Sequence, residues 1–352
     1  MSRSPSPARG GRGTVLNPAS RFERLEVDRE PWTTLEDPSP RTRFYRDASR
    51  TLLVTNDSPD VGLDVGINPY RGCEHGCVYC FARPNHEYLG FSAGLDFESR
   101  ILVKEDAPSL LREALRRPSW RPRTIMLSGV TDPYQPVERR LRITRRCLEV
   151  LAEARNPASL ITKNHAVTRD LDLLGELARH EAVAVTLSVT TLRRGLQRVM
   201  EPRTSTPLRR LDAIRVLSGA GIPVGVNLAP VIPGLNDEEI PAILEAAAEA
   251  GARWAGYILL RLPHGVKSLF EHWLEEHFPD RKEKVMSRIR ETYGGKLYDG
   301  TYGVRGKGKG AYADQIKGLF RATVRKLGLQ GPPELSAASF RPPPPAGQLS
   351  LF

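Results

Sequence analysis

Short apolar runs alternate with longer amphipathic stretches between about residues 61 and 265. Six of these runs have the length of a buried strand: 61–67, 124–127, 159–161, 183–189, 222–228 and 254–260. The stretches between them predict helices over about 138–154, 170–179, 207–219 and 238–250. Strands separated by helices of this length form parallel βαβ units. The pattern therefore predicts an α/β fold, and six successive units favour a partial (β/α)6 barrel of the TIM type over a doubly wound sheet.

The two ends of the chain differ from this core in composition. Residues 1–42 are rich in Pro, Arg and Ser, which predicts a disordered tail, so we expect the barrel core over 43–265. Residues 266–330 combine helical patterning with many cations and predict a basic C-terminal helical extension. Residues 331–352 contain four consecutive prolines and predict an extended tether.

Several classes of protein are disfavoured by what the sequence lacks. It has no run of about 18 apolar residues, so we expect no membrane span. Its first residues have no apolar stretch of the kind found in secretory signals. Only four cysteines occur, three of them clustered, which is not a disulfide framework. These features predict a protein of the reducing cytoplasm.

Three cysteines, Cys73, Cys77 and Cys80, fall within eight residues directly after the first predicted strand. Loops at the carboxyl ends of barrel strands carry the active site, which makes this loop a candidate metal site. A structural zinc or a fully ligated iron–sulfur cluster takes four protein ligands, whereas three thiolates leave one metal position open. The alternative is a zinc site completed by His75, although its place inside the short loop makes tetrahedral geometry awkward.

The cysteine spacing, with Tyr79 before the third cysteine, resembles the signature of the radical S-adenosylmethionine (SAM) superfamily. The segments 67–84 (INPYRGC to ARP) and 128–136 (SGVTDPYQP) are similar to the branch related to spore photoproduct lyase, often labelled DNA-repair-photolyase-like. The resemblance covers about residues 45–325. It implies a [4Fe–4S] cluster on the three cysteines, SAM on the open iron, and a separate reductase as the electron donor.

The same resemblance implies contacts to SAM at the ends of successive strands. Thr131 would lie near the amino group of SAM, Lys163 would pair with its carboxylate, and Ser188 would bond the ribose. Asn227 and Pro230 would border the adenine. Lysine is rare before residue 267, where only Lys104 and Lys163 occur, which favours a specific role for Lys163. The plain alternative for the hydroxyl residues is that they satisfy loop backbone groups.

The chain departs from spore photoproduct lyase at one position that matters for chemistry. That enzyme uses an additional cysteine after the second strand to return a hydrogen atom, whereas the corresponding position here is about Gly129. The remaining thiol, Cys147, lies in a predicted helix, where a small buried apolar residue is the default interpretation. Repair of a thymine dimer by the known route is therefore not implied, and no catalytic residue is assigned.

Cations are concentrated near the end of the chain, which has a net charge of +11. Residues 281–330 hold 13 Lys or Arg and 4 Asp or Glu. Such a segment attracts polyanions, so we expect a nucleic acid as partner, although a solvated basic face remains the alternative. The glycine–lysine loop 305–310 suits phosphate contacts. Four tyrosines flank it and can either stack on bases or pack the helices: Tyr293, Tyr298, Tyr302 and Tyr312.

The last five residues, Gln348 to Phe352 (QLSLF), resemble the peptide by which bacterial proteins bind the DNA sliding clamp. An extended segment of this kind inserts its apolar side chains into pockets while the glutamine fixes the register. The resemblance implies the clamp as a partner and favours DNA as the substrate. The alternatives are a radical SAM enzyme that modifies RNA, and a metal-bearing nucleic-acid adaptor without turnover.

Overall fold

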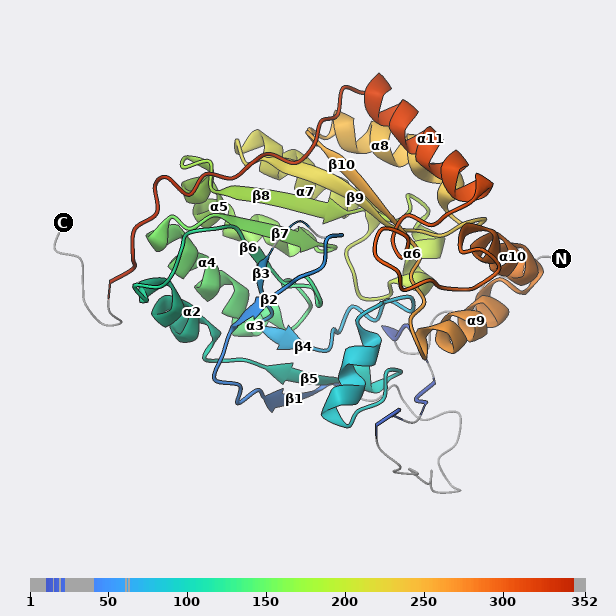
Figure 1. Ribbon diagram of the computed structural model, residues 1–352, viewed down its shortest axis with the longest axis horizontal. Helices are drawn as coiled ribbons and strands as arrows, with labels where there is room; N and C mark the ends of the chain where they lie inside the picture. Colours follow the sequence, from blue (N-terminus) through green and yellow to red (C-terminus); the bar gives the residue numbers. More distant parts are fainter. Residues whose placement is uncertain are drawn as a thin grey trace.

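The computed structural model describes residues 11–14, 16–18, 20–22, 41–60, 62 and 64–344. Six parallel strands follow one another across a seven-stranded sheet in their order along the chain (Figure 1). They are β3 (Val65–Ile67), β6 (Ile125–Leu127), β7 (Ala158–Thr162), β8 (Val183–Ser188), β9 (Val224–Val231) and β10 (Ala255–Leu259). The short strand β2 (Leu53–Thr55) adds antiparallel to β3 at one edge. All six predicted strands are present, which confirms the α/β fold and the partial barrel.

Helices cover the outer face of this sheet (Figure 1). They are α2 (Ala107–Arg116), α3 (Glu138–Leu141), α4 (Ile143–Ala154), α5 (Leu171–Ala178), α7 (Pro207–Gly219) and α8 (Ile240–Glu249). The short helix α6 (Arg194–Met200) lies instead beyond the carboxyl ends of the strands, where its apolar side chains join a second core (Figure 1). The predicted helix 138–154 is divided into α3 and α4 because Arg142 takes a left-handed conformation with φ 52°. Helix α7 has the bounds that the apolar spacing predicts.

The main core lies between the sheet and these helices. In β8, Val183, Val185 and Leu187 belong to that core. Successive strand residues point to opposite faces, so Thr186 and Ser188 point into the barrel. The apolar residues of β8 therefore hold the helices, and its polar residues are left for a site inside the barrel.

A second, three-stranded sheet lies beside the barrel and was not expected from the sequence. It consists of β1 (Arg43–Arg46), β5 (Arg100–Val103) and β4 (Tyr70–Arg71), in the order β1-β5-β4. The cysteine loop leaves β4 and leads into the short helix η2 (Arg83–Leu89), and α1 (Asp96–Ser99) precedes β5. This sheet therefore anchors both ends of the segment that carries the cysteines.

The C-terminal extension forms α9 (Val266–His277), α10 (Lys282–Thr292) and α11 (Ala311–Lys326). Helices α9 and α10 turn apolar side chains such as Phe270 and Ile289 into a second core that also contains Cys77 and Tyr79. Helix α11 crosses α8 on the outside of the barrel (Figure 1). The extension thus packs against one side of the cysteine loop.

The described part of the predicted tether runs along the amino ends of the barrel strands, away from the cysteine loop (Figure 1). The amide of Ser336 donates to the carbonyl of Glu181, and that of Arg341 donates to Ala154. Both acceptors stand before the amino ends of barrel strands. Residues Gln348–Phe352 lie outside the described residues. Within the described part, no helix is long and apolar enough to cross a membrane.

Candidate active site

The cysteine loop is buried and shaped by its own backbone hydrogen bonds. Cys73 and Cys77 are buried, Cys80 is partly exposed, and all three are free thiols. The amide of Cys73 donates to Phe97, that of Cys80 to Cys77, and that of Val78 to Met200. Burial and, to a lesser degree, the neighbouring Cys73 raise the pKa of the Cys80 thiol to about 11. A metal that binds these sulfurs must therefore displace their protons.

A buried arginine, Arg83, holds the backbone of the cysteine loop through hydrogen bonds. Arg83 is fully buried and donates from Nε and Nη2 to the carbonyl of Cys77, at 3.0 and 2.8 Å. Its Nη1 donates to the carbonyl of Gly94 at 2.9 Å, and it forms an ion pair with the buried carboxylate of Glu98. The sequence motif ARP thus supplies the cation that holds the cysteine backbone in place.

A piece of the predicted tail lies against the same loop. The amide of Gly13 donates to Glu98 Oε2 at 2.9 Å, and the amide of Leu95 donates to the carbonyl of Leu16 at 3.0 Å. Gly13 is so close to Gly76 that a Cβ at position 13 would lie 1.5 Å from the Gly76 carbonyl oxygen. These contacts are made by the main chain of the tail, so a composition poor in apolar residues did not reveal them.

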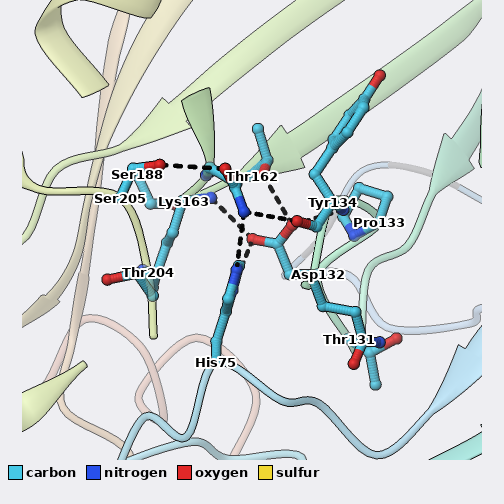
Figure 2. Close-up of polar contacts among 12 residues, drawn as sticks. His75, Thr131, Asp132, Pro133, Tyr134, Thr162, Lys163, Ser188, Thr204 and Ser205 are labelled. Carbon is cyan, nitrogen blue, oxygen red and sulfur yellow. Dashed lines mark hydrogen bonds and ion pairs between the residues drawn. The ribbon is translucent and has the colours of Figure 1, made fainter. Parts of the chain in front are cut away.

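The TDPYQP segment connects the cysteine loop to the barrel. Asp132 accepts hydrogen bonds from the hydroxyl of Thr162 and the amide of Lys163, both at 2.7 Å (Figure 2). Gln135 accepts from the amide of Glu74 at 2.9 Å and donates to the carbonyl of Gly72 at 3.2 Å. Its side chain thereby binds the residue on each side of Cys73.

His75 contacts both the TDPYQP segment and the cysteine loop. Its Nδ1 lies 3.4 Å from Asp132 Oδ2, and its Nε2 lies 3.3 Å from Nδ2 of Asn164 (Figure 2). Burial lowers the pKa of His75, but Asp132 and Cys73 outweigh it and raise the pKa to about 10. Among the described residues, no three His, Cys, Asp or Glu side chains are arranged around a single metal ion. A cluster is a different case, because each thiolate binds its own iron.

A row of predicted SAM contacts crosses the interior of the barrel. The strand register pairs Ser188 of β8 with Asn227 of β9, and Asn227 with Gly256 of β10. The Oδ1 atom of Asn227 is buried and has no hydrogen-bond partner among the described residues. A Cβ at Gly256 would lie 3.2 Å from that oxygen, so the missing side chain leaves room beside it. An unpaired buried acceptor fits a ligand that donates hydrogen bonds, as the adenine and ribose of SAM do.

Lys163, at the end of β7, lies between this row and the cysteines. Its Nζ donates to the carbonyl of Ala229 at 2.8 Å and lies 3.6 Å from Glu201 Oε1. Its charge lowers the pKa of Cys77 and Cys80, although burial keeps both values raised. Its Nζ also lies 5.9 Å from the ring centroid of Tyr79, the residue before Cys80, so its charge is close to the cysteine loop.

Thr131, the fourth predicted contact, is buried, and its hydroxyl donates to the carbonyl of Tyr70 at 3.0 Å. Only the lone pairs of its oxygen are left for a ligand. The role of Thr131 near SAM stays a prediction, as do those of Lys163, Ser188 and Asn227.

Sequence reasoning missed Glu201, the centre of a buried polar network. This carboxylate is fully buried, forms an ion pair with Arg210, and accepts hydrogen bonds from the hydroxyls of Tyr79 and Thr190. Burial raises its pKa, but Arg210 and Lys163 outweigh that effect and lower it to about 2. Glu201 is the only acidic residue between Glu181 and Asp212, a sequence signal that could have identified it.

Comparison with known proteins places this geometry in a family. Residues 67–247 match the family model described as the radical SAM superfamily. An uncharacterized protein of Mycobacterium bovis is 40% identical over 229 residues, which cover 64% of this chain and 66% of that protein. An uncharacterized protein of Methanocaldococcus jannaschii is 28% identical over 227 residues, which cover 64% of this chain and 81% of that one.

Solved structures of spore photoproduct lyase share the fold. One mutant has a TM-score of 0.57 at 18% identity, covering 81% of this chain and 79% of that chain. Another, with bound AdoMet and a dinucleoside spore photoproduct, has a TM-score of 0.55 at 17% identity, covering 81% and 78%. Because the family model matches just over half of the chain, this protein belongs to the radical SAM superfamily, whose enzymes use a [4Fe–4S] cluster and SAM.

Proposed function

We propose that Cys73, Cys77 and Cys80 hold the cluster and that SAM lies along the row formed by Lys163, Ser188 and Asn227. The observation that carries this proposal is the position of Lys163, whose Nζ lies 5.9 Å from the ring centroid of Tyr79, the residue before Cys80. The same Nζ donates to the carbonyl of Ala229 in β9, the strand that also carries Asn227. When bound, the cluster supplies the electron that cleaves SAM to methionine and a 5′-deoxyadenosyl radical.

The residues of the chain would bind and shield the reactants. Lys163 supplies a positive charge for the carboxylate of SAM, and Asn227 supplies an acceptor for a donor group of the nucleoside. Ser188 adds a hydroxyl, and Thr131 an acceptor oxygen. Helices α9 and α10 pack against Cys77 and Tyr79 and exclude water from that side of the loop. We expect a separate reductase to deliver the electron in a reducing cytoplasm.

We further propose that the substrate is DNA or a DNA lesion. The positive charge of the extension 281–330 favours a polyanionic substrate. The structural neighbour spore photoproduct lyase has been solved with a dinucleoside spore photoproduct. The loop after β6 contains no cysteine near Gly129, so the proposal does not include the hydrogen-return step of that enzyme. RNA is the second candidate substrate, because the same cations would serve it.

The direct test is anaerobic reconstitution of the full chain with iron and sulfide. We expect about four irons per protein and production of methionine and 5′-deoxyadenosine when the protein is reduced with SAM present. A variant with all three cysteines replaced by alanine supplies the background for both measurements. Zinc binding without iron, or a loaded cluster that leaves SAM intact, would end the proposal and favour the adaptor.

The C-terminal peptide Gln348–Phe352 is proposed to bind the sliding clamp. Only three residues separate it from Pro344, whose carbonyl accepts a hydrogen bond from Arg112 at 3.1 Å. The peptide would thus leave the barrel at the end opposite the cysteine loop, so clamp and substrate would not compete for one surface.

Deleting residues 348–352 should weaken binding to purified bacterial sliding clamp at least about tenfold, because the apolar anchors of such peptides carry most of the affinity. Surface plasmon resonance measures the effect. A variant that keeps these five residues in scrambled order controls for tail length and composition. Equal affinity of the wild-type and scrambled proteins would exclude the clamp as a specific partner of this peptide.

A further inference from the structure

Arg261, two residues past the end of β10, is a cation with no hydrogen bond or ion pair among the described residues, and its guanidinium lies over an aromatic ring. Its guanidinium carbon lies 4.5 Å from the ring centroid of Phe81, the residue after Cys80. Its Nε atom is buried and has no hydrogen-bond partner among the described residues. Within that part of the chain it forms no ion pair either. No hydrogen bond of its terminal nitrogens occurs there, so the charged end of the guanidinium is left for a ligand that accepts hydrogen bonds.

The other cations around Arg261 are already engaged. Arg305 donates from Nε to Asp60 at 2.6 Å, and Lys309 pairs with Asp299 at 3.1 Å. Lys307 donates to the carbonyl of Tyr257 at 2.9 Å. The carboxylate of Asp60 feels the charge of Arg261, which helps to lower its pKa, but both of its oxygens are already bonded. One accepts from Arg305, and the other accepts from the amide of Gly303 at 2.7 Å. Among these four cations, Arg261 is the one whose side chain has no hydrogen bond or ion pair within the described residues.

Two exposed aromatic rings lie against the cations of this region, Phe81 against Arg261 and Tyr302 against Arg305. Phe81 is 40% exposed, and Tyr302 is 53% exposed, with the guanidinium carbon of Arg305 at 4.6 Å from its ring centroid. The hydroxyl of Tyr293 holds the two segments together, because it donates to the carbonyl of Leu260 at 2.9 Å and lies 3.1 Å from that of Arg305. A free guanidinium fork beside exposed rings suits a nucleotide, whose phosphate binds the fork and whose base stacks on a ring.

We propose that Arg261 binds a backbone phosphate of single-stranded DNA and that Tyr302 stacks on an adjacent base, which holds the strand at the barrel mouth beside Cys80. The inference rests on the proposed function, since it takes nucleic acid as the substrate class. It adds a defined subsite to the general attraction of the basic extension.

The test measures fluorescence anisotropy of a labelled 12-nucleotide single-stranded DNA with the full-length, cluster-loaded enzyme. Arg261→Gln should raise the Kd at least about tenfold, since hydrogen bonds to charged groups contribute that much. The slope of log affinity against log salt should fall by about 0.7, the value for one lost phosphate contact on a single strand. Arg261→Lys should recover only part of the affinity, because an ammonium lacks the planar fork.

Two further variants separate a site from diffuse attraction. Tyr302→Leu should weaken binding at least about fivefold through lost stacking. Arg325→Gln removes the same charge from an exposed position on α11, where the described residues offer its side chain no ion pair, and should change the Kd less than about threefold. Thermal unfolding of each variant checks that the fold is retained.

Equal losses in Arg261→Gln and Arg325→Gln would overturn the subsite, and so would a wild-type enzyme that binds no DNA. Tighter binding of an RNA strand of the same sequence would overturn DNA as the ligand. SAM cleavage by the wild-type enzyme is measured in parallel without nucleic acid. A wild type that cleaves SAM while both arginine variants bind DNA alike leaves the proposed chemistry standing and removes only this inference.

Discussion

Replacing Arg83 by methionine should lower the free energy of unfolding of the metal-free protein by about 3 to 5 kcal/mol, the cost of breaking a buried ion pair. The substitution leaves the buried carboxylate of Glu98 without its cation and the carbonyl of Cys77 without two donors. The backbone between Cys77 and Cys80 then loses its support. We expect the variant to retain little iron after reconstitution, measured by urea unfolding and by iron content.

Two controls separate stability from shaping of the loop. Arg116→Met removes an exposed arginine on α2 and should change stability by no more than about 0.5 kcal/mol. The double variant Arg83→Met, Glu98→Leu removes both buried charges and should recover part of the stability, while the Cys77 carbonyl stays unbonded. Full iron content in the single variant would show that Arg83 does not position the cysteines.

Lys163→Ala should raise the Kd of SAM at least about tenfold and leave the iron content unchanged. An ammonium that binds a carboxylate contributes about 1.5 to 3 kcal/mol, and the substitution removes this contribution to SAM binding. Glu201 keeps its ion pair with Arg210, so the fold should survive. Equilibrium binding of SAM to the cluster-loaded variant measures the effect, with urea unfolding alongside.

Lys104 provides a matched control, because it is the only other lysine before residue 267. It is buried and donates to the carbonyl of Thr51 at 2.8 Å, away from the cysteines. Lys104→Ala should therefore lower stability without changing SAM affinity. If Lys163 serves only as a second counter-ion for Glu201, its variant will behave like that of Lys104, with normal SAM binding and reduced stability.

The barrel was predictable because its signals are local. Each strand is a short apolar run, and the spacing of apolar residues in α4 identifies its helix without tertiary information. The second sheet could not be predicted from the sequence. Its strand β1 has the sequence RFYR, with exposed residues throughout, and β4 has only two residues. Such strands owe their conformation to their partners, and no hydrophobic pattern marks them.

The candidate site divides in the same way. Spacing singles out the three cysteines as a candidate metal site. The family resemblance implies Ser188 and Asn227 at strand ends, and the register places these two residues side by side. The roles of Arg83 and Glu201 depend on partners distant in sequence. A buried charge looks in the sequence like any surface charge, and only the fold shows which opposite charge neutralises it.

The cysteine loop is held on one side by the arginine of the ARP motif and on the other by the backbone of Gly13. Its conformation is thus determined by protein contacts before any iron arrives. In thermodynamic terms, the conformational entropy of ordering the loop is lost on folding and not on metal binding. The affinity for the cluster can then reflect the iron–sulfur bonds themselves, and the metal-free protein should resemble the loaded one, unlike a zinc finger, which folds only around its ion.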